Sequence, residues 1–191
     1  MRTPFAVRAI LWLWFFAAVA VGQLATLQRL PRPAVPGLVI AITAALVLAY
    51  RRLPPLRAWV DAIDVRALVL LHVTRFVGLY FLILYDRGEL PYAFAVPAGI
   101  GDIVVAALAL AVVFVPLGDA TPLRAITIWN VLGLTDILLV VFSAARIALA
   151  GGDGLLPLTQ LPLSLLPTFL VPLIIATHLA IFARLAPAPA A

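Results

Sequence analysis

A histidine and an arginine lie three positions apart inside an apolar run of the sequence. The run covers residues 70–85, LLHVTRFVGLYFLILY, and contains His72 and Arg75. An ionised side chain in hydrocarbon costs roughly 2.5 to 3.5 kcal/mol, so it is retained where it is paired, hydrated or functional. These two residues are therefore the first candidates for chemistry.

Four more polar residues interrupt other apolar runs. In a helix, residues three apart lie on the same face. Asn130, Gly133 and Asp136 have this spacing, and so do His72 and Arg75. The sequence thus predicts polar helix faces rather than scattered polar positions. The full candidate set is His72, Arg75, Asp102, Asn130, Asp136 and His178.

The elements that carry these residues are predicted to cross a membrane. Hydrophobic residues make up 65% of the 191 residues, and charged residues only 11%, whereas soluble domains carry about 25% charged residues. A helix needs about 20 apolar residues to span the hydrocarbon. The sequence predicts an all-α integral membrane protein, a single domain of six transmembrane helices followed by a disordered tail at 186–191. The expected spans are 5–27, 34–50, 67–85, 93–116, 123–149 and 163–185.

The arginines predict the orientation. Loops that stay in the cytoplasm are enriched in basic residues. With the N-terminus inside, eight arginines lie on the inner side and four on the outer side, so both termini are expected in the cytoplasm. The absence of lysine and the high alanine content suggest a bacterial inner membrane. The inner set is Arg2, Arg8, Arg51, Arg52, Arg57, Arg66, Arg124 and Arg184, and the outer set is Arg29, Arg32, Arg87 and Arg146.

The first apolar segment has two interpretations. Arg2 and Arg8 precede it, and residues 18–20 resemble a signal-peptide cleavage site. The apolar run continues beyond that site, which fits a retained helix, and the sequence leaves cleavage open. Its aromatic residues are expected to face lipid or to anchor the helix at the membrane interface. These are Trp12, Trp14, Phe15 and Phe16.

Depth within the membrane predicts that the candidate residues meet. At about 1.5 Å of rise per residue, His72 and His178 both lie roughly 8 to 11 Å below the inner surface. Asn130 is expected in the same layer. Arg75, Asp102 and Asp136 are expected nearer the midplane. The sequence therefore predicts one buried ionisable cluster drawn from four helices.

The charges of this cluster suggest proton or ion handling. One arginine and two aspartates sum to −1 when all are ionised, and such groups titrate as a coupled unit. Pro97, Pro167 and Pro172 predict that spans four and six are interrupted, with the carbonyls of Leu163 and Thr168 left free. Broken helices are typical of ion and solute sites. The leading interpretation is binding and transport of protons, ions or a small polar solute.

Other interpretations stay open. His72 and His178 could be the axial ligands of a b-type haem, or could join the aspartates around zinc. The polar residues could also only hold helices together, as in a non-catalytic subunit or scaffold with a membrane protein partner. Because the sequence has no cysteine, disulfides and iron–sulfur ligation are excluded. The partners expected are the lipid bilayer and a polar solute or ion, not nucleic acid, and an enzyme is not favoured.

Overall fold

Six apolar helices form the framework of the molecule. The computed structural model describes residues 3–31, 33–114, 122–151 and 154–185. These residues contain six helices long and apolar enough to cross a membrane, as predicted. Helices α1 and α2 form the first two spans, α4, η2 and α5 together the third, and η4 with α8 the last. Their bounds are Phe5–Gln23 (α1), Ala34–Arg52 (α2), Val65–Leu71 (α4), His72–Val77 (η2), Gly78–Asp86 (α5), Tyr92–Phe114 (α6), Pro122–Leu149 (α7), Leu166–Leu170 (η4) and Val171–Leu185 (α8).

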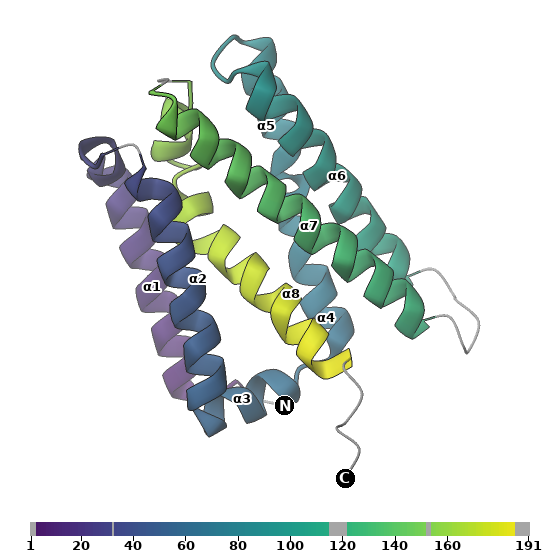
Figure 1. Cartoon of the computed structure of the whole chain (residues 1–191). Helices are drawn as coiled ribbons and strands as arrows, with labels where there is room; N and C mark the ends of the chain where they lie inside the picture. The colour runs from purple at the N-terminus through teal and green to yellow at the C-terminus, as the bar shows by residue number, and fades with distance from the viewer. Residues whose placement is uncertain (1–2, 32, 115–121, 152–153, 186–191) are drawn as a thin grey trace.

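Short helices connect the spans. Helix α3 (Pro54–Asp61) leads from α2 into α4, and the turns η1 (Thr26–Arg29) and η3 (Leu156–Thr159) lie at the other end of the bundle. Helix α1 begins and α8 ends at the same end as α3 (Figure 1), as six crossings require.

The observed helix ends differ from the expected ones by a few residues. Helix α1 stops at Gln23, and Leu27 belongs to η1 instead. Helix α2 continues to Arg52, and the last span begins at Leu166 rather than at 163. Pro116 and the predicted disordered tail at 186–191 lie outside the described residues.

Two apolar cores enclose a polar layer. The first core lies towards η3, and includes Phe81, Phe94 and Leu166. The second lies towards the termini, and includes Val69, Val105 and Ile181. Along α4–η2–α5, α6, α7 and α8 alike, the buried polar residues fall between the positions that belong to these two cores. The polar residues are thus held at one level of four helices.

Helix α6 is continuous, so the predicted break in span four is wrong. Pro97 lies inside the helix and lacks the N–H that would bond to the carbonyl of Ala93. The hydroxyl of Ser143 on α7 donates to this carbonyl at 3.3 Å. Because a neighbouring helix satisfies the freed acceptor, α6 does not need to unwind.

Helical geometry changes instead in the third and last spans. The segment η2 is a 3₁₀ helix in the middle of the third span, which the sequence analysis missed. In the last span, η4 is a π-helical turn that contains Pro167, so the predicted interruption there is present. Mid-helix segments of both kinds are often found at functional sites.

The last span is tied to α1 at this interruption. The carbonyl of Thr168, one turn before Pro172, accepts a hydrogen bond from Trp14 Nε1 at 2.8 Å. The ring of Phe169 packs against Trp14 and Phe15, with centroids 4.5 and 5.6 Å apart. Trp14 and Phe15 therefore face the bundle, in contrast to the expectation that they face lipid.

The outer surface is apolar. Large side chains such as Trp12, Ile40 and Leu139 are exposed, and α1 and α2 are the least buried of the six spans. An apolar surface of this extent requires a lipid environment.

Candidate functional site

An arginine between two aspartates forms the centre of the polar layer. The guanidinium of Arg75 donates from Nε to Asp102 Oδ1 at 2.7 Å and from Nη2 to Asp136 Oδ2. Its Nη1 donates to the carbonyl of Gly133 at 3.0 Å. Arg75 is only 1% exposed. We call Arg75, Asp102 and Asp136 the charged triad.

Local backbone geometry brings the triad together. In a 3₁₀ helix residues three apart are eclipsed, so η2 places His72 and Arg75 directly in line. Gly78 and Gly99 allow α5 and α6 to approach closely, since a Cβ built on Gly99 would lie 2.8 Å from the carbonyl oxygen of Gly78. A side chain at Gly101 would collide with the carboxylate of Asp136. These glycines therefore give space that the ion pairs need.

Two histidines form a second group beside the triad. The rings of His72 and His178 are in contact, with centroids 4.1 Å apart, and neither residue is exposed. Trp129 closes the group, with its ring centroid 4.9 Å from that of His72. We call His72 and His178 the histidine pair.

Hydrogen bonds determine which nitrogen of each neutral histidine carries the proton. Asn130 donates from Nδ2 to the carbonyl of His178 at 3.0 Å, so its Oδ1 must accept from His178 Nδ1 at 2.7 Å. Thr177 donates to the carbonyl of Ile174, so its oxygen must accept from His72 Nε2 at 3.2 Å. The remaining nitrogens, His72 Nδ1 and His178 Nε2, have no partner among the described residues. In the neutral rings these nitrogens are unprotonated acceptors.

Gly133 joins the two groups. Its carbonyl accepts from Arg75, as described above, and its lack of a side chain leaves room for the imidazole of His178. A Cβ at this position would lie 2.6 Å from Cε1 and 3.0 Å from Nε2 of that ring. Gly133 therefore contacts Arg75 of the charged triad through its carbonyl and leaves room for His178 of the histidine pair.

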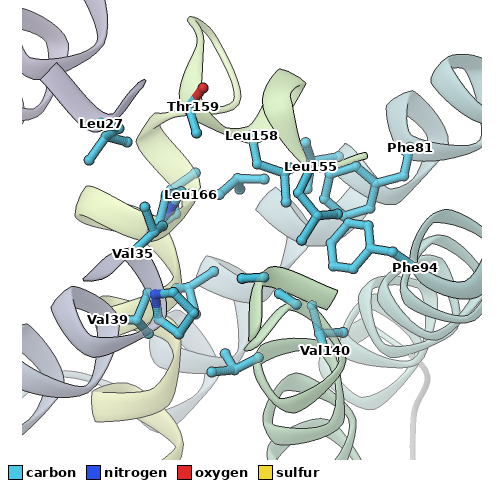
Figure 2. A pocket seen from close by; sticks show the side chains of 18 of the residues that line it. Leu27, Val35, Val39, Phe81, Phe94, Val140, Leu155, Leu158, Thr159 and Leu166 are labelled. Carbon is cyan, nitrogen blue, oxygen red and sulfur yellow. The ribbon is translucent and has the colours of Figure 1, made fainter. Parts of the chain in front are cut away.

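The charged triad borders a cavity of about 200 Å³. The side chains of Val35, Phe81, Phe94 and Val140 are among those that surround it (Figure 2). The walls are mostly apolar and come from α2, η2, α5, α6, α7 and the last span. Arg75 and Asp102 also line the cavity, whereas Asp136 does not.

Asp136 reaches a different surface. Its side chain is 23% exposed, against 5% for that of Asp102. The apolar residues Ile100 and Leu132, on α6 and α7 around it, are themselves exposed. The triad therefore lies between the cavity on one side and the outer surface of α6 and α7 on the other.

A family comparison covers five of the six spans of this bundle. Residues 32–186 match DUF8737, a family described as a domain of unknown function. The chain belongs to the DUF8737 family. No curated protein and no solved structure matches the chain. The DUF8737 match excludes α1 and includes all the helices that supply the charged triad and the histidine pair.

All six residues singled out from this DUF8737 sequence lie in the polar layer. The sequence analysis expected the histidines and Asn130 in one layer and Arg75, Asp102 and Asp136 in a deeper one, whereas the structure holds both groups between the same two apolar cores. The sequence analysis also missed Thr177 and Trp129, which orient and cover the histidines. The only signal for these two residues in the sequence was adjacency, because Thr177 directly precedes His178 and Trp129 directly precedes Asn130.

The histidine pair does not fit a haem. Bis-histidine ligation requires the iron and its macrocycle between the two imidazoles. Here the rings touch each other, and His72 is also in edge contact with Trp129. The axial-ligand role predicted for His72 and His178 is therefore incompatible with this arrangement.

The described residues do not form a zinc site either. A catalytic zinc site needs three protein ligands. The described part of the chain contains no group of three or more histidine, aspartate or glutamate side chains that could hold a metal. Both aspartates are instead paired with Arg75.

Proposed function

We propose that this protein binds protons, ions or a small polar solute at the charged triad and moves them across the membrane. The observation that carries the proposal is the position of the triad. A buried arginine holds two carboxylates, of which Asp102 borders the cavity and Asp136 reaches the outer surface of α6 and α7. A carboxylate that borders a cavity can bind a proton or a cation from it, and the shared arginine couples that charge to the second carboxylate.

The charge of the triad supports this proposal. Arg75 contributes +1 and the two aspartates −2 when all are ionised, which leaves a net −1 in a place of low dielectric. An isolated charge is unfavourable there, so uptake of one proton or cation would neutralise the site. Arg75 itself stays protonated. The exchangeable charge therefore belongs to the aspartates.

The histidine pair extends the site. His72 Nδ1 and His178 Nε2 can each accept a proton, and the ring of His178 lies next to Gly133, whose carbonyl accepts from the guanidinium. A proton on either imidazole would be repelled by Arg75 and attracted by the two carboxylates. We therefore assign the histidines a secondary role in proton handling, subordinate to that of Asp102 and Asp136.

The orientation is part of the proposal. The bias of the arginines towards one side supports cytoplasmic termini in a bacterial inner membrane. Alkaline phosphatase fused to the C-terminus should be inactive in a bacterial host, and phosphatase fused after residue 88 should be active. The opposite pattern would reverse the orientation.

Flux measurements test the function. Purified protein in liposomes that enclose a pH-sensitive dye should collapse an imposed pH gradient faster than empty liposomes do. Asp102→Asn and Asp136→Asn should each abolish this flux, because each removes one of the exchangeable charges. Asp64→Asn is the matched control, since Asp64 is an exposed residue that accepts a hydrogen bond from the backbone of Arg66 at the start of α4.

A purely structural role predicts a different result. If both variants lower thermal stability and neither changes flux, the triad only holds helices together, as polar pairs in membranes commonly do. The protein would then be a subunit or scaffold. A stoichiometric membrane protein partner in gentle purifications would support that outcome.

A further inference from the structure

We propose that the cavity binds a protonated amine with an apolar body, whose ammonium group pairs with Asp102. This inference rests on the proposed function and names the class of solute that the site would take. It depends on three features of the cavity, namely its walls, the hydrogen bonds of its polar end, and its net charge.

The walls fit an apolar body of modest size. A volume of about 200 Å³ equals that of roughly seven water molecules in the liquid. The wall opposite α2 includes the rings of Phe81 and Phe94, whose centroids are 5.4 Å apart. Such a surface favours an alkyl chain or one aromatic ring over a sugar or an amino acid.

The polar end has an acceptor that lacks a donor. Arg75 donates only to Oδ1 of Asp102, and none of the described residues donates to Oδ2. Asp102 lines the cavity, and Oδ2 is not among the buried atoms that lack a partner. This oxygen is therefore accessible, and a ligand that donates a hydrogen bond would satisfy it.

The charge selects a cation rather than an anion. Arg75 lines the cavity too, but its guanidinium is already paired with both aspartates. An anionic ligand would add a third negative charge around one arginine. An ammonium group would bring the net charge of the triad and ligand to zero, which is the favoured state in a low dielectric.

A ligand series with one chain and three head groups tests the assignment. Octylamine, octanol and octanoate would be added in radiolabelled form to nanodiscs that contain the protein, and the amount bound to empty nanodiscs subtracted. We expect saturable binding of octylamine at neutral pH. Octanol and octanoate should bind more weakly by roughly tenfold or more, the change expected for the loss of one charge-assisted hydrogen bond.

Two variants locate the bound amine. Ala144→Phe would fill the cavity without touching the triad, because Ala144 lines the cavity, and it should abolish octylamine binding. The matched control is Ala107→Phe, since Ala107 is exposed on α6 and does not line the cavity. Asp102→Asn should weaken octylamine binding to the level of octanol. If this variant does not fold, the comparison of head groups in the unmodified protein decides the question.

Each other outcome contradicts the inference. Tighter binding of octanoate would make Arg75 the recognition group, and equal binding of octanol would show that the cavity recognises only the chain. Unchanged octylamine binding in Ala144→Phe would place the amine elsewhere. The binding and flux measurements distinguish this inference from the proposed function. A proton flux that depends on Asp102 without amine binding overturns only this inference. Amine binding without any flux overturns the transport function and leaves the binding site.

Discussion

The charged triad and the histidine pair are both buried at the same level of the bundle, yet they differ in what surrounds them. Arg75 uses all three of its nitrogens in hydrogen bonds, and the triad borders a cavity and an outer surface. The histidines each leave one nitrogen without a partner among the described residues, and neither is exposed. Every nitrogen of Arg75 has a partner and the triad is accessible, whereas the histidines are partly unpaired and enclosed.

This difference indicates how a membrane protein separates stability from function. A buried charge is tolerated only when it is paired. All three residues of the triad must therefore be in place before the site can bind or release a proton or an ion. Neutral imidazoles need fewer partners, and the surrounding apolar cores can hold them by packing. The same level of the bundle thus contains one group that is held in place mainly by ion pairs and one that is held in place mainly by side-chain packing.

Arg75→Ala should have the largest effect on stability. The variant leaves two carboxylates without their cation, which is expected to lower the free energy of unfolding by about 3 to 5 kcal/mol. Unfolding in mixed micelles of increasing SDS content would measure the loss. Removing the two carboxylate charges as well, in the triple variant Arg75→Ala/Asp102→Asn/Asp136→Asn, should restore much of the lost stability.

The control for this prediction is Arg66→Ala. Arg66 is exposed at the start of the same span, and surface substitutions usually change stability by less than about 0.5 kcal/mol. If the two arginine variants unfold alike, the triad does not hold the bundle together, and the distinction drawn above is wrong.

Gly133→Ala should have an intermediate effect on stability, because Gly133 contacts both the charged triad and the histidine pair. The new methyl group would overlap the ring of His178, and overpacking of this kind costs about 1 to 3 kcal/mol. Thermal unfolding in detergent would detect it. Gly37→Ala is the matched control, since a Cβ built there meets nothing within 4 Å. A variant at Gly133 as stable as that control would mean that the imidazole does not pack on α7.

In the histidine pair itself the effects should be unequal, comparable to that of Gly133→Ala for His178 and smaller for His72. His178→Phe leaves Asn130 Oδ1 without its buried donor, at a cost of about 1 to 3 kcal/mol. His72→Phe removes one longer bond, while Thr177 keeps its bond to Ile174, so a loss of about 1 kcal/mol is expected. Melting temperatures would rank the two variants. The reverse order would contradict the proton positions inferred from Asn130 and Thr177.

Much of the framework could be predicted from the sequence. The six apolar helices follow from the length of the apolar runs, and the shared face of Asn130, Gly133 and Asp136 follows from helical periodicity. Depth along the spans predicted that the candidate residues meet, but it separated the histidines and the triad into two layers, whereas the structure holds them at one level. The cytoplasmic position of the termini stays a prediction.

The course of the backbone at the prolines could not be predicted. Pro97 leaves α6 intact because Ser143 on another helix satisfies the freed carbonyl, whereas the third span changes to a 3₁₀ helix at η2 without any proline. Whether a proline breaks a helix depends on donors that are distant in the sequence. No local pattern contains that information.

By itself, the sequence determined that these ionisable residues lie in hydrophobic helices, because the length and composition of apolar runs are local properties; their depth in the membrane stays a prediction. Only the tertiary structure decided that Arg75 pairs with both aspartates, that the histidines contact each other instead of flanking a haem, and that a cavity opens beside Asp102. These outcomes depend on how the packed helices are rotated and how closely they approach one another. The close approach needs glycines such as Gly78, Gly101 and Gly133, because a side chain there would collide with a neighbouring helix.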